Sequence, residues 1–289
     1  MEYHSDRFED YSLMVHKDDA LVAVLPANKK EDVVCSHQGL TYGGLVVSSK
    51  MKLKDYIVLF QVVLQFLEFQ GVTTLELKEL PNFYSSIPAE EIGYLAQLTQ
   101  AGITRVDTAS VITYDNRLPI YVKRLRGARK GKNKGLILKE ESSFDAFWEG
   151  VLLPNLRQKY DALATHTSEE IYKLHQVFPK NIRQFNVYKE DVLVAGATIF
   201  ETKTTAHVQY LSAKKEKPQI GALDFLFEEL INKTFAHKKY FDFGTSNKNQ
   251  GKTLNSGLAY WKECFGARTM LHRFYSFDTS SHSLLNSVI

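Results

Sequence analysis

The chain has 289 residues with 44% hydrophobic and 24% charged side chains, values that exclude a disordered or fibrous protein. Its formal net charge is only +3, so any electrostatic case for nucleic-acid binding has to be local. The two cysteines, Cys35 and Cys264, and the scattered histidines have no metal-ligand spacing. We therefore expect a reducing compartment, no bound metal, and either two domains or one closely packed pair.

The sequence contains no evident export or membrane signal. Its first residues are polar and acidic, unlike a secretory signal peptide. The longest apolar stretch, residues 56–69, is interrupted by Gln61, Gln65 and Glu68 and is shorter than the roughly 20 residues that span a bilayer. We expect a cytoplasmic protein without a transmembrane segment.

The first part of the chain predicts antiparallel strands followed by helices and strands in alternation. Alternating or β-branched runs between Ser12 and Ser48 are separated by turn-like pieces. Apolar side chains at helical spacing predict a helix over residues 52–70, which ends at Gly71. The next elements are a strand, a helix and a long strand, over residues 73–80, 89–100 and 103–114.

Residues 121–142 form a basic connection between the two predicted halves. Its beginning, residues 121–135, is rich in lysine, arginine and glycine. One interpretation is a solvated, flexible connection, because runs of charge usually have that role. The other is an anion clamp in which Arg124 and Arg126 bind substrate.

The second half, residues 143–289, begins with two predicted helices. Thr167 or Ser168 precedes a pair of glutamates in the manner of a capping box, which marks the start of the second helix. The order that follows is three strands, a loop, and then helix, strand, helix and closing strands, over residues 182–189, 192–202, 205–213, 214–220, 221–235, 239–244, 253–264 and 268–277.

The two halves share an order of elements, which indicates a weak internal repeat. Both contain antiparallel strands, then helix, strand, helix and strand. A short sequence similarity accompanies this order: Leu21-Val22-Ala23 comes before His37, and Leu193-Val194-Ala195 comes before His207. Duplication explains both observations.

The second half resembles a GNAT acyltransferase in its element order, with a strand that runs through a loop into a helix. Free N–H groups and the positive end of a helix dipole suit phosphates. We therefore predict donor binding by the loop residues Lys214, Lys215, Gln219, Gly221 and Ala222, and by Asn255. The GNAT signature of Gln or Arg, two residues, Gly, one residue and Gly or Ala is not matched, so an ordinary surface loop is the alternative.

Three segments carry a further resemblance: YFDFGTSNKNQGKTLNSGLAYWKECFGAR at 240–268, HVQYLSA before it, and LTYGGLVV in the first half. Together they resemble the double-GNAT proteins related to the Fem peptidoglycan bridge-forming aminoacyltransferases. The resemblance implies an α/β (α+β) fold with two GNAT-like halves, each a mixed, mostly antiparallel sheet flanked by helices. Residues 1–120 would form the acceptor side and 143–289 the donor side. Since relatives carry further helical sequence at the start, it implies a first half without its opening helices.

The candidate catalytic residues are His207, Tyr210 and Asp242. Amide formation needs a base for the incoming ammonium and stabilisation of the oxyanion and the leaving group. Strict alternation places His207 and Gln209 on one face of the strand and Tyr210 on the other, unless a bulge intervenes. A buried core histidine and a capping aspartate are the alternatives. Although Asp242-Phe243-Gly244 also occurs in kinases, no other kinase motif is present.

The candidate substrate-binding residues come from both halves and from the basic connection: His37, Tyr42, Arg124, Arg126, Gln209 and Lys262. We predict an N-acyltransferase that uses an acyl-CoA such as acetyl-CoA and acylates an amine of an amino sugar or cell-envelope precursor. One alternative is an aminoacyl-tRNA donor, with the basic stretch on tRNA phosphates. Another is a non-catalytic binding module of the same fold. A nucleic-acid-binding protein fits less well, because the basic stretch has no interleaved aromatic residues.

Overall fold

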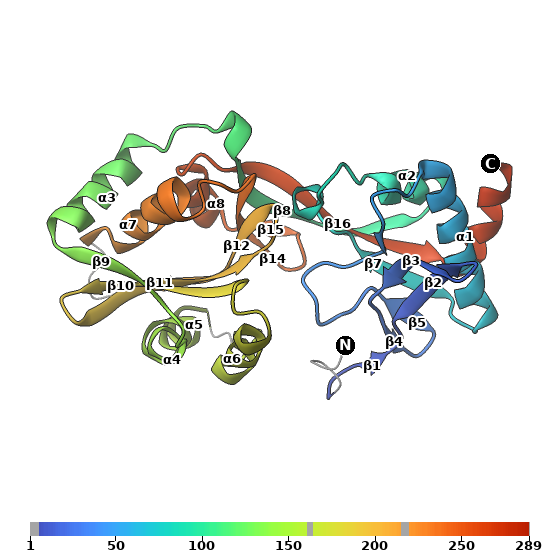
Figure 1. The fold of residues 1–289 in the computed structure, drawn as a ribbon, viewed down its shortest axis with the longest axis horizontal. Coiled ribbons are helices and arrows are strands. Elements are labelled where there is room, and N and C mark those ends of the chain that lie inside the picture. Colours follow the sequence, from blue (N-terminus) through green and yellow to red (C-terminus); the bar gives the residue numbers. More distant parts are fainter. Residues whose placement is uncertain (1–5, 161–163, 215–219, 289) are drawn as a thin grey trace. The chain divides into compact units, whose positions relative to one another are not determined.

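The structure is a computed structural model that describes residues 6–160, 164–214 and 220–288. The chain forms two compact units (Figure 1). Unit 1 comprises Met1–Asp107, Asn249–Lys252 and Leu271–Ile289, and unit 2 comprises Thr108–Lys248 and Thr253–Met270. The closing residues 271–289, which the sequence analysis assigned to the second half, therefore belong to unit 1.

Unit 1 contains a mixed sheet with the strand order β1-β4-β5-β7-β16. The pairs β1–β4, β4–β5 and β7–β16 are antiparallel, whereas β5 and β7 are parallel. A separate antiparallel sheet has the order β2-β3-β6. The strands are β1 (Glu9–Asp10), β2 (Leu13–Lys17), β3 (Ala20–Leu25), β4 (Asn28–Lys30), β5 (Val33–Cys35), β6 (Val46–Val47), β7 (Thr74–Lys78) and β16 (Arg268–Asp278).

Helices α1 (Leu53–Phe69) and α2 (Glu91–Leu98) supply much of the core of unit 1. In α1 the buried side chains recur at helical spacing, among them Phe60, Leu64 and Leu67, which is the pattern of one core-facing stripe. They pack with residues of β3, β5, β7 and β16. A 3-10 helix over Thr279–Ser287 adds Leu285 to this core. The predicted helices and strands of this part of the chain are confirmed.

Unit 2 contains a sheet with the strand order β8-β13-β12-β11-β10-β9. Neighbouring strands are antiparallel, except that β12 and β13 are parallel. The strands are β8 (Gly102–Thr113), β9 (Leu136–Glu141), β10 (Ile182–Lys189), β11 (Val192–Glu201), β12 (Thr205–Ala213) and β13 (Tyr240–Thr245), with a short hairpin of β14 (Asn247–Lys248) and β15 (Thr253–Leu254). Both β8 and β16 continue from one unit into the other.

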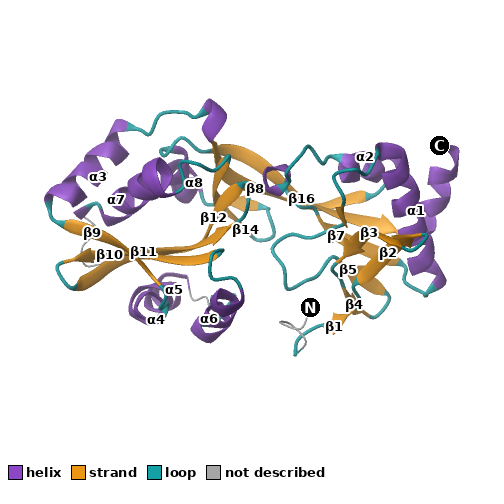
Figure 2. Cartoon of the chain, in the orientation of Figure 1, coloured by secondary structure: helices purple, strands orange, loops and turns teal. Residues whose placement is uncertain are grey.

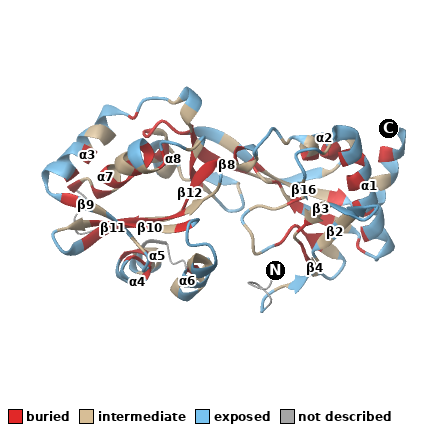
Figure 3. Ribbon diagram, viewed as in Figure 1, coloured by how far each residue is buried: buried red, intermediate tan, exposed pale blue. Residues whose placement is uncertain are grey.

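Helices cover both faces of the unit 2 sheet (Figures 1 and 2). On one face lie α3 (Val122–Asn133), α7 (Ala222–Glu229) and α8 (Ser256–Glu263). On the other lie α4 (Asp145–Phe147), α5 (Leu153–Tyr160) and α6 (Ser168–Val177). Buried residues follow the strands between these layers (Figure 3). As predicted, α6 begins with a capping box, formed by Thr167 and Glu170.

The segment expected to be a basic connection is regular structure within unit 2. Val122–Asn133 form α3, and Leu136–Glu141 form β9, which pairs with β10. The interpretation of residues 121–135 as a flexible connection is therefore wrong. Gly127 and Gly131 explain α3, because a Cβ at Gly127 would lie 1.9 Å from Asp224 Oδ2 and one at Gly131 would lie 3.1 Å from Phe225 Cβ. The two glycines let α3 lie directly against α7.

Across the ranges that the structure describes, no helix combines the length and the apolar character that crossing a membrane requires.

Candidate active site

The candidate active site of unit 2 lies where two parallel strands separate. The pairing of β12 with β13 covers three residue pairs and ends at His207 and Asp242. Beyond that point β13 continues along β8 as far as Thr245. The two strands therefore diverge directly after a histidine and an aspartate that face each other.

His207 and Asp242 form a buried hydrogen-bonded pair. His207 Nδ1 lies 2.7 Å from Asp242 Oδ2, and the two residues are 9% and 2% exposed. The other carboxylate oxygen of Asp242 accepts the backbone N–H of Gly244 at 2.7 Å. Two hydrogen bonds thus fix the carboxylate, which in turn orients the imidazole with its Nε2 away from Asp242.

Gly244 makes room for this imidazole. Its φ is +70°, a left-handed conformation that favours glycine, and a Cβ there would lie 3.3 Å from His207 Cε1. The Asp-Phe-Gly sequence therefore has a structural meaning unrelated to kinases. Asp242 holds the histidine, Phe243 packs in the core, and Gly244 turns the chain beneath the ring.

Gln209 contacts the opposite side of the imidazole, with Oε1 3.1 Å from His207 Nε2. An amide can offer either its oxygen or its NH₂ group to a ring nitrogen. With the oxygen toward the ring, Gln209 accepts a hydrogen bond from the imidazolium. With the amide rotated by a half turn, it donates to neutral imidazole. Gln209 can therefore form a hydrogen bond with the His207 ring both when it is neutral and when it is protonated.

A β-bulge at Gln209 changes which face Tyr210 occupies. Val208 pairs with Ile199 and Tyr210 with Thr198, so Gln209 is the extra residue. Tyr210 packs beside Trp148, in the same cluster as Phe200, the cross-strand partner of His207. Since paired residues share a face, the bulge brings His207 and Tyr210 to one side of the sheet.

The Tyr210 hydroxyl has a partner on that face. It lies 2.7 Å from His166 Nδ1 and accepts the backbone N–H of the same residue at 3.3 Å. Burial raises the pKa of Tyr210, and the His166 amide partly offsets the shift. His166 carries no sequence signal of its own and was missed, because it lies in the loop before α6.

Lys262, predicted to bind substrate, is buried in α8 with 2% exposure. Its Nζ donates to the carbonyl oxygens of Gly244 and Thr245 at 2.9 and 2.7 Å. The side chain therefore fastens the turn after β13 to α8. Burial lowers its pKa to about 8, and the nearby charge of Asp242 opposes the shift.

This lowered pKa predicts a pH-dependent contribution to stability. Lys262 is protonated up to about pH 8 in the folded state but up to about 10.5 in the unfolded chain. Between these values the unfolded state binds more protons, so the free energy of unfolding should rise with pH, by up to about 1.4 kcal/mol per unit. Urea unfolding of wild type and Lys262→Met from pH 7 to 10 should give curves that diverge above pH 8. Parallel curves would contradict this.

The residues predicted to bind the donor are only partly described. Lys215 and Gln219 lie outside the described residues. Lys214 follows β12, and its backbone N–H donates to Val194. Gly221, with φ of +74°, is the N-cap of α7, and Ala222 is the first residue of that helix. Asn255 is the N-cap of α8, where its side chain accepts the N–H of Leu258 at 3.2 Å.

The remaining predicted residues do not form one group. Arg124 pairs with Asp224 in the first turn of α7 at 2.7 Å, whereas Arg126 is exposed on α3. His37 and Tyr42 belong to unit 1. His37 accepts the N–H of Gly39 in a turn, and Tyr42 lies against Tyr84. The structure thus brings together His207, Gln209, Asp242 and Lys262 from the predicted set.

Unit 1 repeats the strand geometry of the site. Its parallel pair, β5 and β7, also covers three residue pairs and ends at Cys35 and Glu76. Cys35 Sγ lies 3.4 Å from Glu76 Oε2. Burial, followed by the neighbouring Glu76 carboxylate, raises the pKa of Cys35 to about 12. A thiol with this pKa is not a nucleophile at neutral pH, so the equivalent position of unit 1 lacks the chemistry of His207.

Comparisons with known proteins bear on the fold. No family model and no curated protein sequence matches the chain. It is similar to the solved structure of FemX, with 10% identity over 100% of this chain and 92% of that chain and a TM-score of 0.67. It is also similar to L-PGS from Bacillus licheniformis, with 14% identity, coverages of 96% and 89%, and a TM-score of 0.57.

A tandem GNAT protein from the clavulanic acid biosynthesis pathway is a third similar structure, with 10% identity, coverages of 93% and 82%, and a TM-score of 0.51. The chain therefore has the double-GNAT fold, which confirms the predicted fold class. Among the described residues, no group of three or more His, Cys, Asp or Glu side chains is arranged to hold a metal ion.

Proposed function

We propose that the protein is an N-acyltransferase that moves an acyl group from an acyl-CoA to an amine. The observation that carries this proposal is the Asp242–His207–Gln209 chain of hydrogen bonds at the point where β12 and β13 diverge. A carboxylate-oriented histidine is suited to remove a proton from an ammonium. The double-GNAT fold, shared with the tandem GNAT protein, supports the same class of reaction.

In the proposed reaction His207 Nε2 takes a proton from the ammonium of the acceptor. The free amine attacks the thioester carbonyl and the C–N bond forms. The attacking nitrogen then loses its second proton to solvent as the C–S bond of the tetrahedral intermediate breaks. The departing thiolate recovers a proton from the imidazolium. Asp242 stabilises the imidazolium throughout and keeps Nε2 directed away from itself. The acceptor that we propose is an amino sugar or a cell-envelope precursor amine.

Two measurements test the donor. Acetyl-CoA should raise the melting temperature of the protein in proportion to the logarithm of its concentration. A thiol-trapping assay with a panel of amines should detect release of coenzyme A. No thermal shift with any acyl-CoA would overturn this donor, and binding without thiol release would favour a non-catalytic module.

A second candidate donor is aminoacyl-tRNA, which one feature of unit 2 favours. Helix α3 and the residue after it expose Lys123, Arg126, Arg129, Lys130, Lys132 and Lys134. The helix contains no acidic residue, and its glycine-containing face is packed on α7. Arg126 and Arg129 lie on the side of the helix away from α7, where successive phosphates can contact them.

The α3 surface gives a prediction that separates the two donors. Arg126→Glu with Lys130→Glu reverses two exposed charges one turn apart. If tRNA is the donor, its affinity should fall more than about tenfold and the salt dependence should become less steep. Lys50→Glu with Lys54→Glu makes the same charge change in unit 1 and should leave tRNA binding nearly unchanged. Equal losses in both variants, measured by filter binding, would indicate non-specific attraction only.

A further inference from the structure

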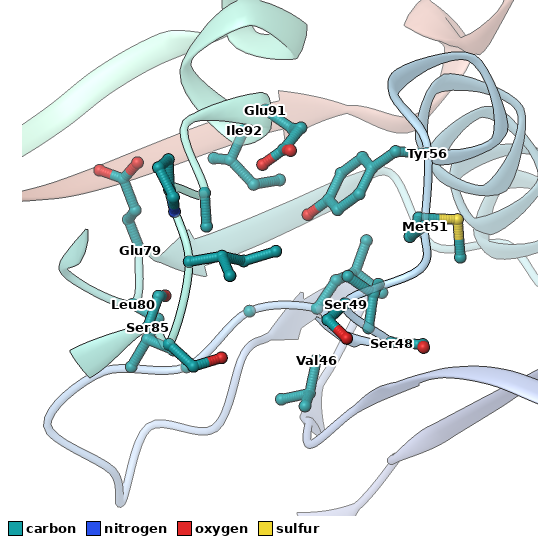
Figure 4. Close-up of a pocket in the computed structure, with 18 of the residues that line it drawn as sticks. Val46, Ser48, Ser49, Met51, Tyr56, Glu79, Leu80, Ser85, Glu91 and Ile92 are labelled. Atoms are coloured by element: carbon teal, nitrogen blue, oxygen red, sulfur yellow. The ribbon is translucent and has the colours of Figure 1, made fainter. Parts of the chain in front are cut away.

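Unit 1 contains a cavity of about 230 Å³ that the proposed chemistry does not use (Figure 4). Its walls are the segment from Gly43 to Met51, the start of α1, the end of β7, and the segment that leads into α2. A cavity of this size holds the volume of roughly eight water molecules. It can therefore accommodate a small organic molecule.

The charged groups that line the cavity are carboxylates. Glu79 and Glu91 contribute to the walls, and no lysine or arginine does. Glu79 is 6% exposed and has one cationic partner, Arg273, with Nη1 at 3.3 Å. Arg273 also lies 3.9 Å from Glu90. Glu79 and Glu90 therefore share one guanidinium, and together with Glu91 they leave the region an excess of negative charge.

Tyr56 places a hydroxyl in the same cavity. The residue is 6% exposed, and its hydroxyl points into the cavity (Figure 4). Burial raises the pKa of Tyr56, and the charges of Glu91 and Glu79 raise it further. No side chain or backbone group within the described residues is hydrogen-bonded to this hydroxyl. The hydroxyl is therefore available to a ligand that enters the cavity.

The rest of the lining is apolar or weakly polar. Leu77, Ile92 and Met51 supply apolar surface, and Ser48, Ser49 and Ser85 supply hydroxyls. An anionic ligand would meet two carboxylates and no cation. A purely apolar ligand would leave the Tyr56 hydroxyl and the Glu91 carboxylate without hydrogen bonds. The described residues include no group able to hold a metal ion.

We propose that this cavity binds a small molecule through a protonated primary amine. The ammonium would donate to the Tyr56 hydroxyl and to the Glu91 carboxylate, while a compact body would lie against the apolar wall. Charge-assisted hydrogen bonds of this kind are stronger than neutral ones. The proposal concerns unit 1 alone and does not rest on acyl transfer.

The test compares amines with neutral molecules of the same shape. Calorimetry on the full chain, without an acyl donor, should detect binding of 1,5-diaminopentane or glucosamine. Binding of 1,5-pentanediol and glucose should be weaker on the order of tenfold or more, because they cannot form the charge-assisted hydrogen bonds. If neither amine binds, or if the diol binds as well as the diamine, the proposal is overturned.

Two tyrosine variants locate the site. Tyr56→Phe removes only the hydroxyl in the cavity and should weaken amine binding on the order of tenfold, with no loss of thermal stability. Tyr275→Phe is the matched control, because Tyr275 is 3% exposed in the same core and does not line the cavity. It should bind the amine like wild type. Unchanged binding by Tyr56→Phe would place the amine elsewhere and overturn the proposal.

Discussion

Replacement of His207 by Gln is expected to lower the rate of acyl transfer by about 10²–10⁴-fold, the usual contribution of a general base. Glutamine cannot take the proton of the ammonium at neutral pH. Asp242→Asn should cause a loss of similar size for another reason. If the new amide oxygen still accepts from Gly244, its NH₂ group meets His207 Nδ1. The ring proton then moves to Nε2, and the base is lost.

The assay is kcat/KM for thiol release, with the melting temperature measured on each variant. His237→Gln is a suitable control, because the His237 side chain is 63% exposed. The double variant His207→Gln with Asp242→Asn should be no slower than the worse single variant, since the two residues act as one unit. A His207→Gln protein that is folded and retains its rate within about threefold would exclude this histidine as the base.

The sequence predicted most elements of the fold because their signals are local. The stripe of α1 and the capping box of α6 can be recognised within a few residues. Helix α3 could not be recognised, because it has few apolar residues and consists mostly of lysine, arginine and glycine. Such a composition contains no apolar stripe that would mark a helix. The stability of α3 comes from the close approach of Gly127 and Gly131 to α7, which is a tertiary contact. The four-residue spacing of these glycines was the available signal.

The candidate site was harder to predict, because it depends on register. His207 and Asp242 are 35 residues apart, and only the parallel pairing of β12 and β13 brings them together. Alternation alone separates His207 from Tyr210, and the bulge at Gln209 reverses that result. Lys262 was predicted to bind substrate, whereas in the structure its side chain is buried and its Nζ donates to two backbone carbonyls.

The internal repeat also looks different once the register is known. The short sequence similarity paired Leu21-Val22-Ala23 with Leu193-Val194-Ala195, yet β3 belongs to the small sheet and β11 to the large sheet of unit 2. The equivalent positions are Cys35 with Glu76 and His207 with Asp242, the last pairs before parallel strands separate. These pairs share no residue type. The likeness of the two units at these positions therefore lies in the hydrogen-bond pattern, which a sequence comparison does not detect.

Replacement of Gly221 by Ala is expected to destabilise unit 2 by about 2–5 kcal/mol. Gly221 has φ of +74°, which costs an alanine about 1–2 kcal/mol. In addition, its Cβ would lie 2.2 Å from the carbonyl oxygen of Gly127, and such overpacking costs about 1–3 kcal/mol. Since that oxygen belongs to backbone, relief requires α3 to move away from α7. The start of α7 would shift, and donor binding should weaken along with stability.

Gly135→Ala separates the two contributions. Gly135 has the same φ of +74°, but no atom lies within 4 Å of the position its Cβ would take. This variant should therefore lose only the backbone cost of about 1–2 kcal/mol. Urea unfolding followed by tryptophan fluorescence suits the comparison, because both tryptophans, Trp148 and Trp261, lie in unit 2. If Gly221→Ala were no less stable than Gly135→Ala, α3 could not be packed on the start of α7, and the cations of α3 would lose the support that orients them.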